Sequence, residues 1–277
     1  MHIQFFKPES ALLKDYIEGY YFLAHDAAEP ATAYLTFPNN FAILSVCEQV
    51  SIHYDALNVS VSGGPEGNFA SELICHFKTP AAITYEGQIN EITFYFKPLG
   101  LNAFLPQALS AYTSAYFSSF DPYEDFRPYM QLILKEKDLD RRREMIEAYW
   151  IKKFLGFSHP VLQAVTKDLL QKDTRGQLEQ IAQKYCTNRQ YIHEQFKLHL
   201  CKTPAEFRKT QRFRETLIGS IDMKRRGDNL TALSYDALFY DQSHLIRDFK
   251  SFTGMTPKKF LESISFQEGA MINWLYL

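Results

Sequence analysis

The C-terminal third of the sequence contains an internal repeat at an offset of 53 residues, and this repeat constrains the fold more than any other feature. The matching positions are Ile192-x-x-x-Phe196-Lys197 with Leu245-x-x-x-Phe249-Lys250, Thr203-Pro204-x-x-Phe207 with Thr256-Pro257-x-x-Phe260, and Asn188 with Asp241. The last residues of each copy are typical of the beginning of a helix, because Thr is a good N-cap residue and Pro suits the first helical turn. In the first copy Glu206 completes a capping box with Thr203. We therefore expect two copies of one helical unit.

Each copy has the spacing of a helix-turn-helix unit, at about 177–200 and 229–253. The first copy has an apolar helix face over 178–185, a tight turn at Cys186-Thr187, and a second helix that Asn188 caps and that ends near Leu200. In the second copy Leu230, Leu233 and Ala237 mark the first helix. Asp241 caps the second helix there, and Gly254 stops it. A longer helix from Pro204 to about Ile218 is expected to join the units.

The second helix of such a unit enters the major groove of DNA, so its solvent face is the candidate reading surface. By helical periodicity this face carries Arg189, Gln190, His193, Glu194 and Lys197 in the first unit, and Gln242, Ser243, Ile246, Arg247 and Lys250 in the second. Gln can pair with adenine and Arg with guanine through two hydrogen bonds each. Polar faces are also the rule on solvated helical bundles, and that is the alternative interpretation for any single residue.

The charge distribution separates the same region from the rest of the chain. Residues 1–158 carry 12 Lys and Arg against 19 Asp and Glu, a net charge of −7, whereas residues 159–265 carry 18 against 12, a net charge of +6. A basic portion favours nucleic acid as a partner. Lys224-Arg225-Arg226 lies between the two units, a position suited to phosphate contacts. We therefore expect double-stranded DNA to be the partner.

The first half of the chain has the pattern of a β domain. Short segments rich in β-branched and aromatic residues alternate with turn residues, at Ala33–Phe37, Phe41–Val46, Ser51–Tyr54, Val59–Val61, Ile74–Phe77 and Ile92–Phe96. This spacing predicts a sandwich or barrel, followed by a short helix at Leu101–Leu105. Helical spacing over Pro128–Lys137 and Asp140–Phe154 predicts two helices, with the charged stretch Lys135–Glu144 as an exposed hairpin loop. These helices could form a dimer interface or cover the β core.

The four cysteines and eight histidines form no metal or catalytic motif. C-x-x-C, H-x-H and H-E-x-x-H are all missing from the sequence, and Ser62–Gly67 lacks the Lys-Ser/Thr of a phosphate loop. We therefore expect no metal, no cofactor and no enzymatic activity. No apolar run approaches the roughly 20 residues of a bilayer-spanning helix, and the N-terminus lacks the pattern of a secretory signal. We expect a cytoplasmic protein with no membrane partner.

At residues ~160–265 the sequence resembles the AraC/XylS family of bacterial transcription regulators. The segment that carries the resemblance is Tyr240-Asp241-Gln242-Ser243-His244 … Phe249-Lys250 … Thr253-Gly254-Met255-Thr256-Pro257. The resemblance implies an α+β protein with a cupin-like β sandwich or barrel and flanking helices at 1–155, helices near 121–155, and an all-α DNA-binding domain at 160–265. It also implies base contacts from Gln190, His193 and Glu194 and from Gln242, Ser243, Ile246 and Arg247.

Three departures from the family pattern change these expectations. Cys186 and Leu238 stand where the family usually has Gly in the turn, a position at which left-handed backbone strains other residues. Glu194 stands where Arg is frequent, and DNA phosphates repel it. Ile246 offers only an apolar contact. We expect the second unit to read bases more strongly than the first.

The implied function is a sequence-specific DNA-binding transcription regulator controlled by a small-molecule effector in the N-terminal domain. The alternative is an N-terminal domain that serves only for dimerisation or partner binding, without a ligand. A homodimer and contact with RNA polymerase are further expectations. The sequence does not identify which residues would bind an effector.

Overall fold

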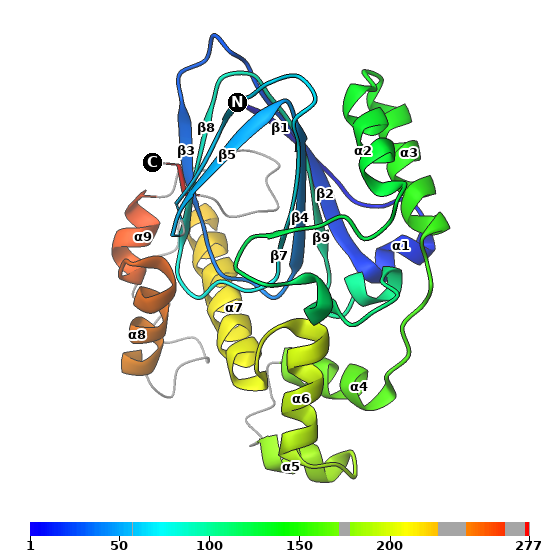
Figure 1. The fold of residues 1–277 in the computed structure, drawn as a ribbon. Helices are drawn as coiled ribbons and strands as arrows, with labels where there is room; N and C mark the ends of the chain where they lie inside the picture. The colour runs from blue at the N-terminus through cyan, green and yellow to red at the C-terminus, as the bar shows by residue number, and fades with distance from the viewer. Residues whose placement is uncertain (57, 172–177, 227–241, 264–274, 277) are drawn as a thin grey trace.

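Two β-sheets face each other in the N-terminal half of the chain, and helices make up the C-terminal half (Figure 1). The computed structural model describes residues 1–277 except 57, 172–177, 227–241, 264–274 and 277. The first sheet, sheet A, has the order β1 (His2–Phe6), β2 (Ile17–His25), β9 (Ile89–Phe96), β4 (Ala42–Glu48), β7 (Phe69–Ile74) and β10 (Ser118–Ser119). The second, sheet B, has the order β11 (Leu275–Tyr276), β3 (Thr32–Thr36), β8 (Ala81–Glu86), β6 (Asn58–Gly63) and β5 (Val50–Asp55). Neighbouring strands are antiparallel except β6 and β8, which are parallel.

Sheet A is buried on both faces. Successive side chains of a strand point to opposite sides, so its strands contribute to two different cores. On β4 and β9, Leu44, Val46 and Phe94 belong to a core that also contains Trp150 of a covering helix. Ile43 and Tyr95 belong to a second core between the two sheets. The predicted fold class, α+β with an N-terminal β sandwich or barrel and a helical C-terminal part, is confirmed. Strand pairing of the described residues does not close the two sheets into a barrel.

Helices cover the outer face of sheet A. These are α1 (Ala11–Tyr16), the 3₁₀ helices η1 (Leu101–Phe104) and η2 (Leu109–Tyr112), α2 (Phe126–Lys135) and α3 (Leu139–Lys152). Buried Met130 of α2 and buried Tyr149 of α3 lie in the outer core of sheet A. Of the two roles considered for this helix pair, the structure shows the cover of the β core; dimerisation stays a prediction.

Two predictions about local structure are wrong. Lys135–Glu144 is not a hairpin loop, because Asp138 caps α3 at Leu139 and accepts a hydrogen bond from Arg141 N at 2.8 Å. Arg142 lies on the helix with its guanidinium over the Phe22 ring, 4.1 Å from the ring centroid. The strand expected at Ile74–Phe77 instead runs over Phe69–Ile74.

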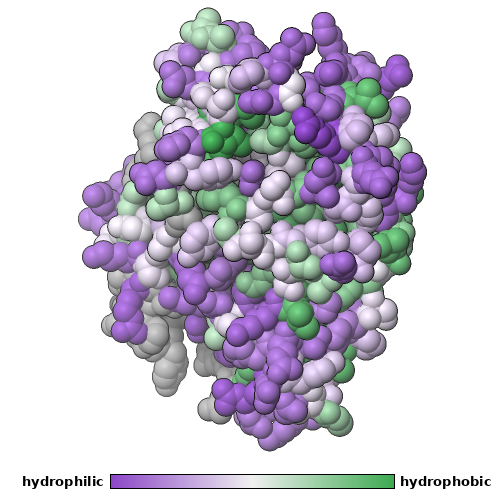
Figure 2. Space-filling view, viewed as in Figure 1, coloured by the Kyte–Doolittle hydropathy of each residue, from purple (hydrophilic) through white to green (hydrophobic). Residues whose placement is uncertain are grey.

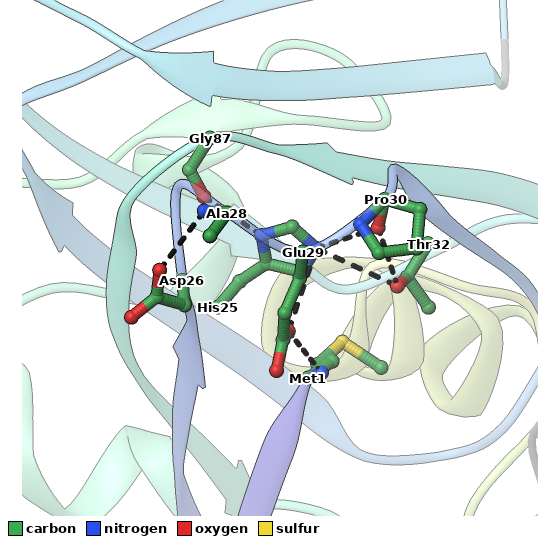
Figure 3. Close-up of polar contacts among 8 residues, drawn as sticks. All are labelled: Met1, His25, Asp26, Ala28, Glu29, Pro30, Thr32 and Gly87. Carbon is green, nitrogen blue, oxygen red and sulfur yellow. Dashed lines mark hydrogen bonds and ion pairs between the residues drawn. The ribbon is translucent and has the colours of Figure 1, made fainter.

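A fully buried histidine holds the turn between β2 and β3 (Figure 3). Nδ1 of His25 lies 2.7 Å from the carbonyl oxygen of Gly87, in the β8–β9 turn, and Nε2 lies 3.2 Å from that of Pro30. Glu29 in the same turn forms an ion pair with the N-terminal ammonium of Met1. Because β2 and β9 belong to sheet A, and β3 and β8 to sheet B, this cluster ties the two sheets together at one end.

The C-terminal helices are α4 (Pro160–Leu170), α5 (Leu178–Lys184), α6 (Arg189–Leu200), α7 (Pro204–Arg226), α8 (Gln242–Thr253) and α9 (Pro257–Ser263). Helices α4, α5 and α6 and the start of α7 share one core, which includes Ile181, Ile192 and Phe196. Farther along α7, Phe213 and Leu217 share another core with Phe249 of α8 and Phe260 of α9. The joining helix α7 is longer than predicted, since it ends at Arg226.

The first helix-turn-helix unit is docked on sheet A. Leu99, just after β9, has left-handed backbone with φ of 66° and places its side chain in the core of this unit. Asn102 donates to the carbonyl oxygen of His199 at 2.8 Å and accepts from the ring of the same residue at 3.0 Å. The C-terminal end of α6 is therefore fixed to the β domain.

A buried lysine strengthens the same interface. Lys202 is 5% exposed, and its Nζ donates to Asn39 O at 2.9 Å and to Asn40 Oδ1 at 3.4 Å. Asn40 in turn donates to the carbonyl oxygen of Phe207 at 3.0 Å. Burial lowers the pKa of Lys202 to about 8.

The second unit is docked on sheet B through one aromatic side chain. Phe37, just after β3, is 2% exposed and belongs to the core of α7, α8 and α9. Its ring meets that of Phe260 edge to face, with 5.2 Å between the centroids. The two units therefore contact different sheets of the β domain.

Candidate nucleic-acid interface and internal cavity

The first candidate DNA-reading helix, α6, begins as the sequence predicts. The Asn188 side chain accepts a hydrogen bond from Tyr191 N at 2.8 Å and caps the helix. Ile192 and Phe196 are buried, which fixes the opposite side of α6 toward solvent. Cys186 in the turn has left-handed backbone with a φ of 51°, a conformation that favours Gly. Leu238, its counterpart in the second unit, lies outside the described residues.

The predicted contact residues of α6 lie on this solvent side. Arg189, Gln190, Glu194 and Lys197 are exposed, and His193 is half-buried. Figure 2 shows a predominantly hydrophilic surface at the lower end of the molecule, where α5 and α6 lie. The structure thus brings all five residues onto one accessible helix face.

One pair of side chains on this face is joined by a hydrogen bond. The Gln190 amide donates one of its two N–H groups to Glu194 Oε1 at 3.0 Å, which leaves the other N–H and the amide oxygen for a base. The weaker base readout expected of the first unit stays a prediction.

The flank of α6 is held by the segment that enters the C-terminal half. Nε2 of His159, whose ring nitrogen Nδ1 caps α4, lies 3.0 Å from Gln195 Oε1 and 3.4 Å from the Tyr191 hydroxyl. Upstream, Gly156 N donates to Ala103 O at 3.1 Å. Residues 155–160, which join the two halves of the chain, therefore pack against both of them.

The second candidate reading helix, α8, is described only in part. Arg247 and Lys250 are exposed on it, and Phe249 on the opposite side is buried. The side chains of Gln242, Ser243 and Ile246 lie outside the described residues, as do the cap Asp241, the first helix of this unit and the side chains of Lys224-Arg225-Arg226. After α8, Gly254 takes a φ of 72°, as a helix stop requires.

The core between the two sheets contains a cavity of about 90 Å³. Strands from both sheets line it, and most of its walls are aromatic or aliphatic. Glu91 at 2% exposed lies deep in it, whereas Tyr54 at 39% exposed also lines it. The cavity therefore opens to the surface beside Tyr54, whose ring packs on that of Phe117 with 5.2 Å between centroids.

A buried carboxylate organises the polar part of this cavity. Glu91 Oε1 accepts from the hydroxyls of Tyr21 at 3.1 Å and Thr93 at 2.6 Å. Glu91 Oε2 accepts from the Tyr85 hydroxyl at 2.8 Å and from the Cys47 thiol at 4.0 Å. Burial first, and the Glu91 charge second, raise the pKa values of Tyr21, Tyr85 and Cys47. These groups stay neutral donors.

Glu91 and Glu72 are site residues that sequence reasoning did not identify. The ladder places Glu91 opposite Cys47 and Glu72 opposite Ser45, so the two carboxylates flank β4 on the cavity side. Burial raises the pKa of Glu72. One signal was available: each is the single charged residue of its strand, Phe69–Ile74 or Ile89–Phe96.

Among the described residues, no group of three or more His, Cys, Asp or Glu is placed to hold a metal ion. No helix of the described part of the chain is long and apolar enough to cross a membrane.

Comparison with known proteins yields one family match and several structural ones. The model of a family described as a helix-turn-helix domain matches residues 181–263. The fold resembles that of ToxT from Vibrio cholerae in a 1.65 Å structure, with a TM-score of 0.42 and 10% identity over 89% of this chain and 98% of that one. A structure of wild-type ToxT with bound unsaturated fatty acid has a TM-score of 0.43 and 13% identity over the same shares. ToxT bound to (E)-4-(8-methylnaphthalen-1-yl)but-3-enoic acid has a TM-score of 0.42 and 11% identity over 87% of this chain and 97% of that one. No curated protein matches the sequence.

Proposed function

We propose that this chain, whose C-terminal region carries a helix-turn-helix domain of the AraC type, is a DNA-binding transcription regulator that responds to a small molecule bound between its two sheets. Residues 1–155 form the sensing part and residues 160–265 the DNA-binding part. The observation that carries the DNA-binding half of the proposal is α6, a capped helix with an apolar side in a packed core and a polar side free of the β domain. Such a helix has the form of a major-groove reader.

The internal cavity carries the sensing half of the proposal. Small-molecule sites are concave, mostly apolar, and contain a few placed polar groups, as this cavity does. The alternative, an N-terminal domain without a ligand, gives no role to an open cavity with two carboxylates. Homodimer formation and contact with RNA polymerase stay predictions.

Selection from a randomised duplex pool at ~150 mM salt tests the DNA-binding half. We expect two short enriched blocks about one helical turn apart, since two joined units would occupy successive major grooves. Enrichment of one block would indicate that only one unit reads bases. Retention without enrichment would contradict sequence-specific binding, and no retention would move the function to partner binding.

Matched variants assign the contacts. Arg247→Ala should cost roughly 1–3 kcal/mol at the selected site and relax one base position. Arg189→Ala tests the first unit in the same way. Arg141→Ala in the β domain removes an exposed arginine away from both reading helices and should leave binding unchanged. If Arg247→Ala weakened all sequences equally, α8 would not be the reading helix.

A further inference from the structure

The cavity between the sheets has an electrostatic character that limits what can occupy it. Glu72 and Glu91 line it, and the described residues of its lining include no Lys, Arg or His. Arg214 of α7 acts electrostatically on Tyr95 but does not belong to the lining. The described lining therefore combines two carboxyl groups with mostly apolar walls and contains no basic side chain.

The contacts of the Glu91 carboxyl group are all with uncharged groups. It accepts hydrogen bonds from three hydroxyls and a thiol. No Lys, Arg or His of the described lining lies beside it. A cationic group of a ligand would therefore be the only positive charge in contact with the described walls of this cavity, and buried carboxylates normally have such a partner.

The aromatic walls favour the same sign of charge. Tyr21, Tyr34, Tyr54, Tyr85 and Tyr95 line the cavity together with Phe117. Aromatic ring faces attract ammonium groups, and the attraction grows where water is excluded. Tyr34 and Tyr85 stack with 6.0 Å between centroids, and Tyr85 also donates to Glu91. The stacked tyrosine rings and the Glu91 carboxyl group thus lie in the same wall of the cavity.

We infer that the cavity binds an organic cation, an amine or quaternary ammonium group on an apolar body of about one ring. The inference rests on the proposed function, because it names the ligand of the sensing site proposed there. The size follows from the volume of about 90 Å³, which is below the roughly 150 Å³ of an engineered cavity that binds benzene. A one-ring ligand therefore reaches toward the opening, beside Tyr54 and Glu72.

Three probes that share one ring test this inference on the full chain: benzylamine, benzyl alcohol and benzoate. Each is titrated at equal ionic strength, with the melting temperature and tyrosine fluorescence as readouts. At pH 7 we expect benzylamine, as its ammonium ion, to bind about tenfold or more tightly than benzyl alcohol, a factor that cation–π and charge contacts readily supply. Benzoate should not bind.

The carboxylate variants locate the site. Glu72→Gln replaces a lining carboxyl group with an uncharged amide of similar size. It should bring the affinity for benzylamine close to that for benzyl alcohol, with benzyl alcohol binding unchanged. Glu86→Gln is the matched control, because Glu86 is exposed on β8 and does not line the cavity. The melting temperature without probe checks that each variant folds. Unchanged benzylamine binding by folded Glu72→Gln would overturn the assignment to this cavity.

The outcomes separate the inference from the proposed function. Stronger binding of benzyl alcohol or benzoate than of benzylamine overturns the cationic ligand but keeps a small-molecule site. If none of the probes binds up to its solubility limit, both the cationic ligand and the sensing role of the cavity are overturned. DNA selection is unaffected by either result and tests the regulator separately.

Discussion

Replacing Phe37 with Ala is expected to loosen the second helix-turn-helix unit while leaving the first in place. Phe37 follows β3, yet its ring is buried among aromatic side chains of α7, α8 and α9. A buried Phe→Ala change costs about 3–5 kcal/mol, as lost transfer free energy plus the cavity that remains. Of this, about 0.5–1.5 kcal/mol comes from the edge-to-face pair with Phe260.

The substitution should mainly lower the free energy that keeps the core of α7, α8 and α9 closed. At tenfold per 1.4 kcal/mol, 3–5 kcal/mol corresponds to a roughly hundred-fold to several-thousand-fold rise in the opening of this core. Hydrogen exchange followed by mass spectrometry should show that rise in peptides from α8 and α9. Peptides from α6 should keep their protection, because the core of the first unit contains no part of Phe37.

Phe37→Leu is the matched control and should cost less than about 1.5 kcal/mol, since most of the buried volume is kept. The reasoning is refuted if Phe37→Ala raises exchange only around β3, with α8 and α9 still protected. It is also refuted if urea unfolding gives a loss below about 1 kcal/mol.

Three further predictions concern backbone strain, charge and core packing. Cys186→Gly should stabilise the chain by about 0.5–1 kcal/mol in urea unfolding, because Gly relieves left-handed backbone, whereas Cys186→Ala should be nearly neutral; a destabilised Gly variant would contradict the strain. For Glu206, burial alone would raise the pKa, but hydrogen bonds from Lys78 at 2.7 Å and from Thr203 hold it at about 2, below the usual 4.5. The stability that the Glu206 carboxylate contributes is therefore complete above pH 4.5 and is lost as the pH falls through 2. Glu206→Gln should lower the free energy of unfolding by up to about 1 kcal/mol at pH 6, and this difference should shrink below pH 4. A difference between variant and wild type that stays constant with pH would argue against this role. Leu99→Ala should reduce hydrogen-exchange protection in α4 and α6, since Leu99 is the β-domain member of that core, and unchanged protection there would exclude this anchoring role.

Local signals explain why the C-terminal helices could be predicted from sequence. The caps at Asn188 and Thr203 form the hydrogen bonds that their residue types imply. The apolar pair Ile192 and Phe196 is buried as the helical period requires. These features depend on residues three or four positions apart, which a sequence displays directly.

The β domain was harder to predict because sheet A is covered on both faces. Tyr20–Leu23 in β2 is a continuous apolar run, and alternation, the usual signal of a strand, is lost when both sides are buried. The strand expected at Ile74–Phe77 was misplaced for a related reason, since Phe77 is buried beyond the end of its strand.

The polar centre of the cavity depends on contacts that sequence spacing does not reveal. Glu91 accepts from Tyr85 nearby but also from Tyr21, which is 70 residues away. A single glutamate in an apolar strand is a weak signal. Only the register that puts β2 beside β9 brings the carboxylate and this second tyrosine together.

Because the two helix-turn-helix units are docked on different sheets, the β domain sets how the two units lie relative to each other. The His25 cluster pins the sheets together at one end, whereas Phe37 and Leu99 lie beyond the opposite ends of β3 and β9. At that far end the chain itself crosses between the sheets, over residues 37–41 and 75–80. Two reading helices must match major grooves about 34 Å apart. A shift of one sheet relative to the other would therefore strain these two short crossovers or change the spacing between the reading helices.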